Sequence, residues 1–249
     1  MPLLSVDDLR AYYRTEAYGI SRTVRAVDGV SFELYPNEIY GVAGESSCGK
    51  TTLIKVISGN IKPPLKAVSG SVTYDFGGYK ANMLTISPEE MRRNVRWKEI
   101  SYVMQGSMSV LNPVRRVIRT FEDIVESHEG IPDRKAFLEQ TRAHINQLGL
   151  PTEVLDEYPH RLSGGMRQRV KLAQSFAHSP DVLFLDEPMT GLDPMGRSAI
   201  FELIRELGRE GKSVIVSSHV LYEIESVTQT IVLINRGRVL AHGDVREVR

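Results

Sequence analysis

The residues best suited to chemistry lie in one short glycine-rich stretch, residues 44–51. This stretch fits the pattern Gly-x4-Gly-Lys-Ser/Thr, which is typical of a phosphate-binding loop. The glycines let backbone N–H groups converge on phosphate oxygens without interference from side chains. Lys50 can reach the β- and γ-phosphates as a point charge, and the Thr51 hydroxyl can bind Mg²⁺. The loop residues are Gly44, Glu45, Ser46, Ser47, Cys48, Gly49, Lys50 and Thr51.

The segments on either side of this loop support the phosphate-binding interpretation. The apolar run 39–43 predicts a strand that enters the loop, and residues 52–57 predict the helix that leaves it. The N-terminus of such a helix directs free N–H groups and a positive dipole end toward the phosphates. The alternative is a glycine-rich turn that binds nothing. A strand before the turn and a helix after it favour the phosphate loop.

Two carboxylates follow the apolar run 182–185, which predicts a buried strand. Asp186 ends this strand, where an aspartate can bind the Mg²⁺ of a nucleotide. Glu187 comes next, where it can polarise a water molecule for attack on the γ-phosphate as a general base. The alternative for Glu187 is a charge on a surface loop. The phosphate loop earlier in the chain favours the catalytic interpretation.

His219 follows the apolar strand 214–216 and the pair Ser217–Ser218. The two ring nitrogens of a histidine in this position can link the γ-phosphate to the backbone. A single histidine is more often an ordinary loop residue, so this position is informative only together with the others.

A second potential anion site lies in the stretch Leu162, Ser163, Gly164, Gly165 and Met166. Ser163 can cap a helix, and the two glycines would leave the first N–H groups of that helix bare. The alternative is a flexible turn at a helix start. Because one nucleotide cannot use two distant sites, we expect this stretch to bind the γ-phosphate held by another subunit.

Composition places the chain among ordinary globular proteins, with 41% hydrophobic and 25% charged residues. Its formal net charge is zero, which gives no indication of a nucleic-acid partner. Cys48 is the single cysteine, so an internal disulfide is impossible and a reducing compartment is expected. The sequence shows neither a signal peptide nor an apolar run of about 18 residues. We therefore expect any work at a membrane to require a partner.

The pattern of elements predicts an α/β fold. Residues 3–10, 24–27 and 30–34 predict strands of a small antiparallel layer before the phosphate loop, with a loop from residue 14 to residue 23, and residues 71–74 predict a further strand. Ser87 is expected to cap a helix, and residues 113–178 are expected to be helical. The runs 100–104, 182–185, 214–216, 231–234 and 238–241 predict the remaining strands, and a helix should bury Ile200, Ile204 and Leu207.

In order and type, these motifs resemble those of the nucleotide-binding subunit of an ABC transporter. Gln105 matches the Q-loop of that family, residues 162–166 match its signature, and Gly191, Leu192 and Asp193 match its D-loop. The resemblance implies an ATPase with a RecA-like P-loop core, an antiparallel β subdomain and an inserted helical subdomain. It also implies a head-to-tail dimer that encloses two ATP molecules.

The resemblance also assigns individual residues. Gln105 would join Thr51 and Asp186 at Mg²⁺ and assist in catalysis Glu187 and His219, which matches the switch histidine of the family. Thr52 would extend the ATP site, and an aromatic residue would stack on adenine. Tyr13 is the better match for that aromatic residue, and Tyr12 remains an alternative. The whole chain, 1–249, would form one ABC ATPase domain, with the core and β subdomain at 1–106 and 179–249 and the helical subdomain at about 107–178.

A narrower resemblance connects residues 109–113 and 158–169 with the branch that imports oligopeptides or dipeptides, and in some members oligosaccharides or nickel. It implies a second, homologous but different ATPase subunit and two transmembrane permease subunits. An extracytoplasmic substrate-binding protein would act indirectly, and the chain would lie at the cytoplasmic face of the cell membrane. The alternatives are a soluble, non-transport ABC ATPase of DNA repair or translation, and a regulatory P-loop protein without turnover. The first usually carries a long coiled coil or a second cassette, and Glu187 and His219 argue against the second.

Three features depart from the family pattern. Ser47 stands where the family usually has a further glycine, so a positive φ there would cost stability. Cys48 lies inside the phosphate loop, as a small filler or as an oxidation-sensitive group, and we favour the filler. The sequence ends at Arg249, whereas members of the importer branch usually continue, so a shortened chain is expected.

Overall fold

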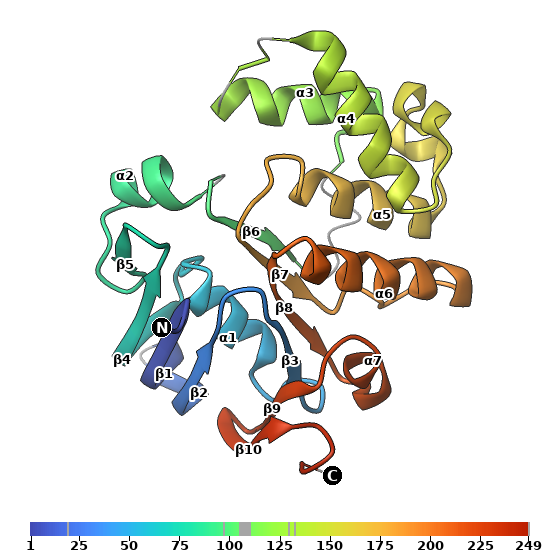
Figure 1. Ribbon diagram of the computed structural model, residues 1–249. Coiled ribbons are helices and arrows are strands. Elements are labelled where there is room, and N and C mark those ends of the chain that lie inside the picture. Colours follow the sequence, from blue (N-terminus) through green and yellow to red (C-terminus); the bar gives the residue numbers. More distant parts are fainter. Residues whose placement is uncertain (19, 97, 105–110, 129, 132, 249) are drawn as a thin grey trace.

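Most strands belong to a mainly parallel six-stranded sheet (Figure 1). We analysed a computed structural model, which describes residues 1–18, 20–96, 98–104, 111–128, 130–131 and 133–248. The strand order is β10-β9-β3-β8-β7-β6, and only β10 runs antiparallel to its neighbour. The strands are β3 (Ile39–Ala43), β6 (Ile100–Val103), β7 (Val182–Asp186), β8 (Ser213–Ser218), β9 (Thr230–Asn235) and β10 (Arg238–Asp244).

The short apolar runs become buried strands, as the sequence predicted. Every residue of β7 and β8 is buried, because helices cover both faces of a parallel sheet. Parallel strands bring their carboxyl ends to one edge: Ala43 pairs with Ser218, and Asp186 pairs with Ser217. The loops that follow β3, β7 and β8 therefore meet at this edge, where ligands bind in open α/β sheets.

A second, antiparallel sheet of four strands has the order β2-β1-β4-β5. Its strands are β1 (Leu4–Ala17), β2 (Ile20–Leu34), β4 (Leu65–Asp75) and β5 (Lys80–Asn82). Helix α1 (Lys50–Ile57) shares one hydrophobic core with both sheets, since Leu53 and Ile54 are fully buried between them. The predicted antiparallel layer is confirmed.

The loop predicted from residue 14 to residue 23 is wrong. β1 and β2 continue as one long hairpin, in which Thr15 pairs with Arg22 and Glu16 pairs with Ser21. Side chains on this outer part of the hairpin are mostly exposed, so no alternation of buried and exposed residues marks it in the sequence. Pairing of the backbone with the neighbouring strand holds this part of the hairpin.

The prediction that residues 113–178 are helical is confirmed. The helices there are α3 (Val117–His128), α4 (Arg134–Gln147) and α5 (Gly164–Ser175). Short 3₁₀ turns at Thr152–Asp156 and Pro159–Arg161 connect α4 to α5. Val117 and Phe121 of α3 belong to the same core as Leu183 of β7, so the helices pack onto the sheet. We propose on this ground that the region is a subdomain, with the boundaries given above.

Three further α-helices lie in the described part of the chain. In α2 (Pro88–Glu90), the Ser87 side chain accepts a hydrogen bond from the Glu90 N–H, as predicted, and a π-helical turn follows at Met91–Val95. α6 (Pro194–Arg209) buries Ile200, Ile204 and Leu207. α7 (Leu221–Glu225) is a short helix directly after β8.

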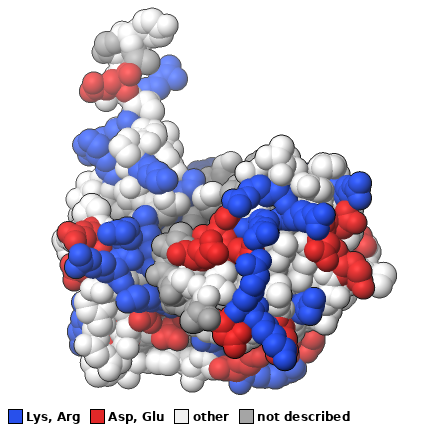
Figure 2. Space-filling view, turned by 90° about the horizontal axis from the view of Figure 1, so that it is seen from above, with Lys and Arg blue, Asp and Glu red and all other residues white. Residues whose placement is uncertain are grey.

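Both signs of charge occur on the surface. Figure 2 shows Lys and Arg side chains in separate groups at the left and the right of the face seen from above, with Asp and Glu side chains beside and between them. Among the described residues, none of the helices has the length and apolar character needed to cross a bilayer.

Candidate nucleotide site

Glycine is required at two positions of the phosphate loop. Gly44 has a φ of 154°, and a Cβ there would lie 2.3 Å from the Ile234 carbonyl oxygen. Gly49 has a φ of 117°, and its Cβ would lie 2.2 Å from the Ala26 carbonyl oxygen. Neighbouring backbone therefore excludes any side chain at either position, and the chain can only follow this path with glycine.

Ser47 has a φ of 64°, the positive value that the sequence analysis considered for this position. A residue with a Cβ pays about 1–2 kcal/mol for left-handed backbone. Cys48 is buried, and its carbonyl oxygen accepts a hydrogen bond from the Gly237 N–H at 2.8 Å. The Cys48 side chain belongs to the same hydrophobic core as Leu53 and Ile54, which supports the filler interpretation.

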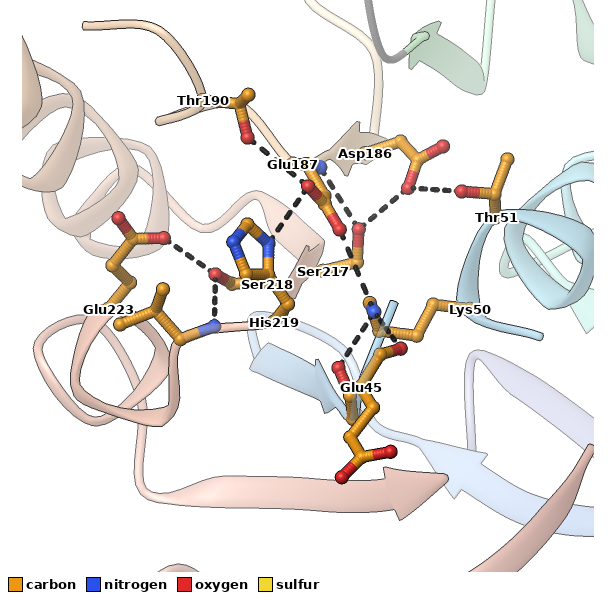
Figure 3. Close-up of polar contacts among 12 residues, drawn as sticks. Glu45, Lys50, Thr51, Asp186, Glu187, Thr190, Ser217, Ser218, His219 and Glu223 are labelled. Carbon is orange, nitrogen blue, oxygen red and sulfur yellow. Dashed lines mark hydrogen bonds and ion pairs between the residues drawn. The ribbon is translucent and has the colours of Figure 1, made fainter. Parts of the chain in front are cut away.

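Lys50 begins α1 and is 4% exposed. Its ammonium group donates to the carbonyl oxygens of Gly44 at 2.8 Å and Glu45 at 2.9 Å. The Lys50 Nζ also lies 3.6 Å from the Glu187 Oε1, as Figure 3 shows. A buried cation needs such partners, and a bound phosphate would offer it stronger ones.

Asp186 lies at the end of β7, surrounded by hydroxyl groups. Its Oδ1 accepts hydrogen bonds from Ser217 at 2.7 Å and Thr51 at 3.2 Å, and its Oδ2 accepts one from Tyr102 at 3.4 Å. Burial raises the pKa of Asp186, and the Ser217 and Thr51 hydroxyls oppose that rise. A buried carboxylate beside a threonine hydroxyl supplies the oxygen ligands that Mg²⁺ prefers, so these residues fit the ion.

Glu187 links the phosphate loop to the predicted switch histidine (Figure 3). Its Oε2 lies 3.0 Å from His219 Nδ1 and accepts a hydrogen bond from the Thr190 hydroxyl at 3.2 Å. Its backbone N–H donates to the Ser217 hydroxyl at 3.0 Å. Glu187 itself is 9% exposed and has a φ of 50°, so the local backbone is held in an uncommon conformation.

A pocket of about 520 Å³ brings the phosphate loop together with Tyr13 of β1 and the stretch Val24–Ala26 of β2. Tyr13 lines this pocket, and its hydroxyl lies 3.3 Å from the Thr52 Oγ1. Tyr12 points elsewhere, because it is buried and donates to Asp28 at 2.5 Å. That hydrogen bond raises the pKa of Tyr12 and lowers the pKa of Asp28. The geometry therefore favours Tyr13 of the two candidates for the adenine contact.

Several lining residues were not predicted from the sequence. They are Val24, Arg25, Ala26, Arg236 and Gly237, in addition to the Ser217 and Tyr102 hydroxyls near Asp186. Arg236 and Gly237 lie in the turn from β9 to β10, at the other end of the chain from the hairpin. Of these residues, only Ser217 could have been found from the sequence, because it follows a predicted strand and lies two positions before His219.

The predicted signature forms the start of α5. Ser163 caps the helix and accepts a hydrogen bond from the Met166 N–H at 3.2 Å. In the part of the chain that the structure describes, none of Leu162, Ser163, Gly164, Gly165 and Met166 lines the nucleotide pocket. The stretch predicted to be a second anion site therefore does not belong to the nucleotide pocket of its own chain.

The predicted D-loop leads into α6. Gly191 has a φ of 78°, Leu192 is buried, and Asp193 caps the helix by accepting from the Gly196 N–H at 3.1 Å. The predicted Q-loop residue, Gln105, lies outside the described residues.

Comparison with known proteins identifies the family. The sequence profile described as "ABC transporter" matches residues 27–190. The dipeptide transport ATP-binding protein of Caldanaerobacter subterraneus subsp. tengcongensis is 32% identical over 99% of this chain and 73% of that protein. The dipeptide transport ATP-binding protein of Bacillus subtilis is 33% identical over 99% of this chain and 72% of that protein.

A solved structure shows the same fold. It is the dimeric, post-hydrolysis state of an ATP-binding cassette with bound ADP and phosphate. The two chains share 21% identity and a TM-score of 0.83, over 98% of this chain and 99% of the other. The predicted fold class is thereby confirmed. From the family profile and the near full-length similarity of these relatives, the chain belongs to the ABC transporter family, as an ATP-binding and ATP-hydrolysing subunit that serves transport.

Proposed function

We propose that this chain powers the import of peptides, as one ATPase subunit of an ABC importer. The observation that carries the proposal is the similarity, over 99% of the chain, to dipeptide transport ATP-binding proteins. A peptidoglycan transport ATP-binding protein of Agrobacterium fabrum is also 34% identical, over 99% of this chain and 44% of that protein. Dipeptides or short oligopeptides are therefore the first substrates to test, and peptidoglycan fragments or oligosaccharides the second.

ATP would occupy the pocket between the phosphate loop and the hairpin. Tyr13 would stack on adenine through its π face, while the loop N–H groups and Lys50 would hold the phosphates. Thr51 and Asp186, with Gln105 as the third proposed ligand, would hold Mg²⁺. Bound there, Mg²⁺ would neutralise charge on the β- and γ-phosphates.

Glu187 is the proposed general base, because its carboxylate lies at the junction of Lys50, Thr190 and His219. It would accept a proton from the water molecule that attacks the γ-phosphate. His219 and Gln105 would hold the reacting groups in place. Only 9% of Glu187 is exposed, and such burial strengthens the interaction of the carboxylate with the charges around it.

The separation of the signature from the pocket supports a head-to-tail dimer. In this arrangement the α5 N-terminus of one subunit, with Ser163 and the two glycines, would cover the γ-phosphate held by the other. The D-loop residues Gly191, Leu192 and Asp193 would lie at the same interface. The second subunit is proposed to be a homologous but different ATPase, and the complex to include two permease subunits at the cytoplasmic face of the membrane. An extracytoplasmic substrate-binding protein would act through the permeases.

Light scattering of the Glu187→Gln protein, with and without Mg-ATP, tests the dimer. A dimer that forms only with Mg-ATP would show that two copies of this chain complete both composite sites. A monomer that still binds ATP would identify a different second ATPase as the required partner. A chain that binds no ATP in a direct titration would overturn the proposed nucleotide site.

Uptake of a labelled dipeptide tests the substrate class. Cells that lack this chain should regain uptake when supplied with the unmodified chain, and should not regain it with the Glu187→Gln chain. Equal uptake with both chains would contradict a role in peptide import. Loss of peptidoglycan-fragment uptake alone would assign the second substrate class.

A further inference from the structure

A buried carboxylate lies next to the switch histidine and has no role in the mechanism above. Glu223 belongs to α7, which follows His219, and it is 8% exposed. Carboxylates are rarely buried unless they are hydrogen-bonded or paired with a cation. The partners of Glu223 therefore indicate what holds it in this position.

On one side, Glu223 fixes the turn that carries His219 (Figure 3). The Ser218 hydroxyl donates to the Glu223 Oε2 at 2.6 Å, and both residues are buried. The same Ser218 oxygen accepts the Val220 backbone N–H at 3.0 Å. These two hydrogen bonds hold the residues immediately before and after His219, and the ring of His219 lies 3.0 Å from the Glu187 carboxylate.

On the other side, Glu223 faces an arginine of α6. The Arg197 Nη1 lies 3.9 Å from the Glu223 Oε1, which makes an ion pair rather than a direct hydrogen bond. The Nε of the same guanidinium donates to the Leu192 carbonyl oxygen at 3.2 Å. Leu192 belongs to the D-loop, so Arg197 contacts the D-loop and Glu223 at the same time.

We infer that Arg197 and Glu223 are positioning residues that couple the D-loop to the switch histidine. The inference rests on the proposed dimer, in which the D-loop lies at the interface with the second subunit. A shift of the Leu192 carbonyl on dimer closure would move the Arg197 guanidinium. The ion pair would pass that movement to Glu223 and Ser218, and so to the orientation of His219 beside Glu187. Contiguous hydrogen bonds and ion pairs of this kind can carry coupling between sites.

Three variants test this link through ATP hydrolysis: Arg197→Ala, Glu223→Gln and the double variant. The glutamine still accepts from Ser218 but no longer attracts Arg197. We expect each single variant to lower kcat by about tenfold and to leave the KM for ATP within about twofold, because catalysis and not binding depends on His219. The double variant should lose no more than the single variants, since both remove one interaction. Additive losses, or an unchanged kcat, would overturn the inference.

A matched control comes from another ion pair on α6. Glu202 and Arg209 lie 3.0 Å apart, and their side chains are 56% and 68% exposed. The Glu202→Gln and Arg209→Ala variants should hydrolyse ATP like the unmodified chain. Thermal melting of all variants separates the link from a purely structural role, which would lower Tm and leave kcat unchanged.

If this chain alone does not hydrolyse ATP, hydrogen exchange of the full chain without nucleotide tests the proposed coupling through Arg197 and Glu223. The Arg197→Ala variant should exchange the Val220 amide at least about fivefold faster, because the turn around His219 loses its support. The Glu202→Gln variant should not. Equal protection of Val220 in Arg197→Ala and the unmodified chain would overturn the inference even if the proposed ATPase activity is found. ATP hydrolysis by the unmodified chain and its loss in Glu187→Gln test the proposed function separately.

Discussion

Replacement of Glu187 by glutamine changes the charge at the centre of the site and little of its shape. The glutamine oxygen can still accept the Thr190 hydroxyl, which lies 3.2 Å from the Glu187 Oε2. The variant removes the negative charge 3.6 Å from the Lys50 ammonium and the acceptor of a proton from the attacking water. Lys50 keeps its hydrogen bonds to the Gly44 and Glu45 carbonyl oxygens.

The expected loss is confined to the chemical step. A positioned general base contributes about 10²–10⁴-fold to the rate. At 1.36 kcal/mol for each factor of ten, the activation barrier should rise by about 3–5 kcal/mol. ATP affinity should stay equal or increase by up to about tenfold, because Lys50 no longer divides its charge between the phosphates and Glu187.

Two assays separate these effects. Single-turnover hydrolysis with excess protein reports the chemical step, and equilibrium titration with a fluorescent ATP analogue reports binding. The Glu210→Gln variant is the control, since Glu210 is an exposed carboxylate at the end of α6. A single-turnover rate within about threefold of the unmodified chain would refute the general-base role of Glu187. Loss of ATP binding would show that the carboxylate supports the pocket instead.

Three further predictions concern the loop and the helical region. Gly49→Ala should abolish ATP binding and lower Tm, because its Cβ would lie 2.2 Å from backbone; unchanged binding would contradict this. Ser47→Gly should raise the free energy of unfolding in urea by up to about 1 kcal/mol, because relief of left-handed strain exceeds the entropy cost of glycine; a loss of stability would contradict this. Burial lowers the pKa of His144 from 6.5 to about 4, so the unfolded chain takes up the proton first on acidification. The contribution of neutral His144 to the free energy of unfolding should be present above pH 6.5, and about 2 kcal/mol of it should be lost between pH 6.5 and about pH 5. The His144→Phe variant should not show this loss. The same pH dependence in both proteins would show that His144 is not responsible.

The sequence by itself determined the residues of the phosphate loop, the Asp186–Glu187 pair, the helix cap at Ser163 and the buried parallel strands. These features depend on local rules: glycine where backbone must approach phosphate, a capping side chain at a helix start, and apolar runs in strands covered on both sides. Each rule acts within a few residues, so each leaves a pattern that can be found in the chain.

Only the tertiary structure decided which residues meet. Thr51 and Asp186 are 135 positions apart, and their contact depends on the order of the strands. The choice of Tyr13 over Tyr12 depends on which face of β1 meets α1, because neighbouring residues of a strand point to opposite sides. The contact of Arg197 with Glu223 likewise depends on how α6 and α7 pack beside β8, since packing between distant segments leaves no periodic signal in the sequence.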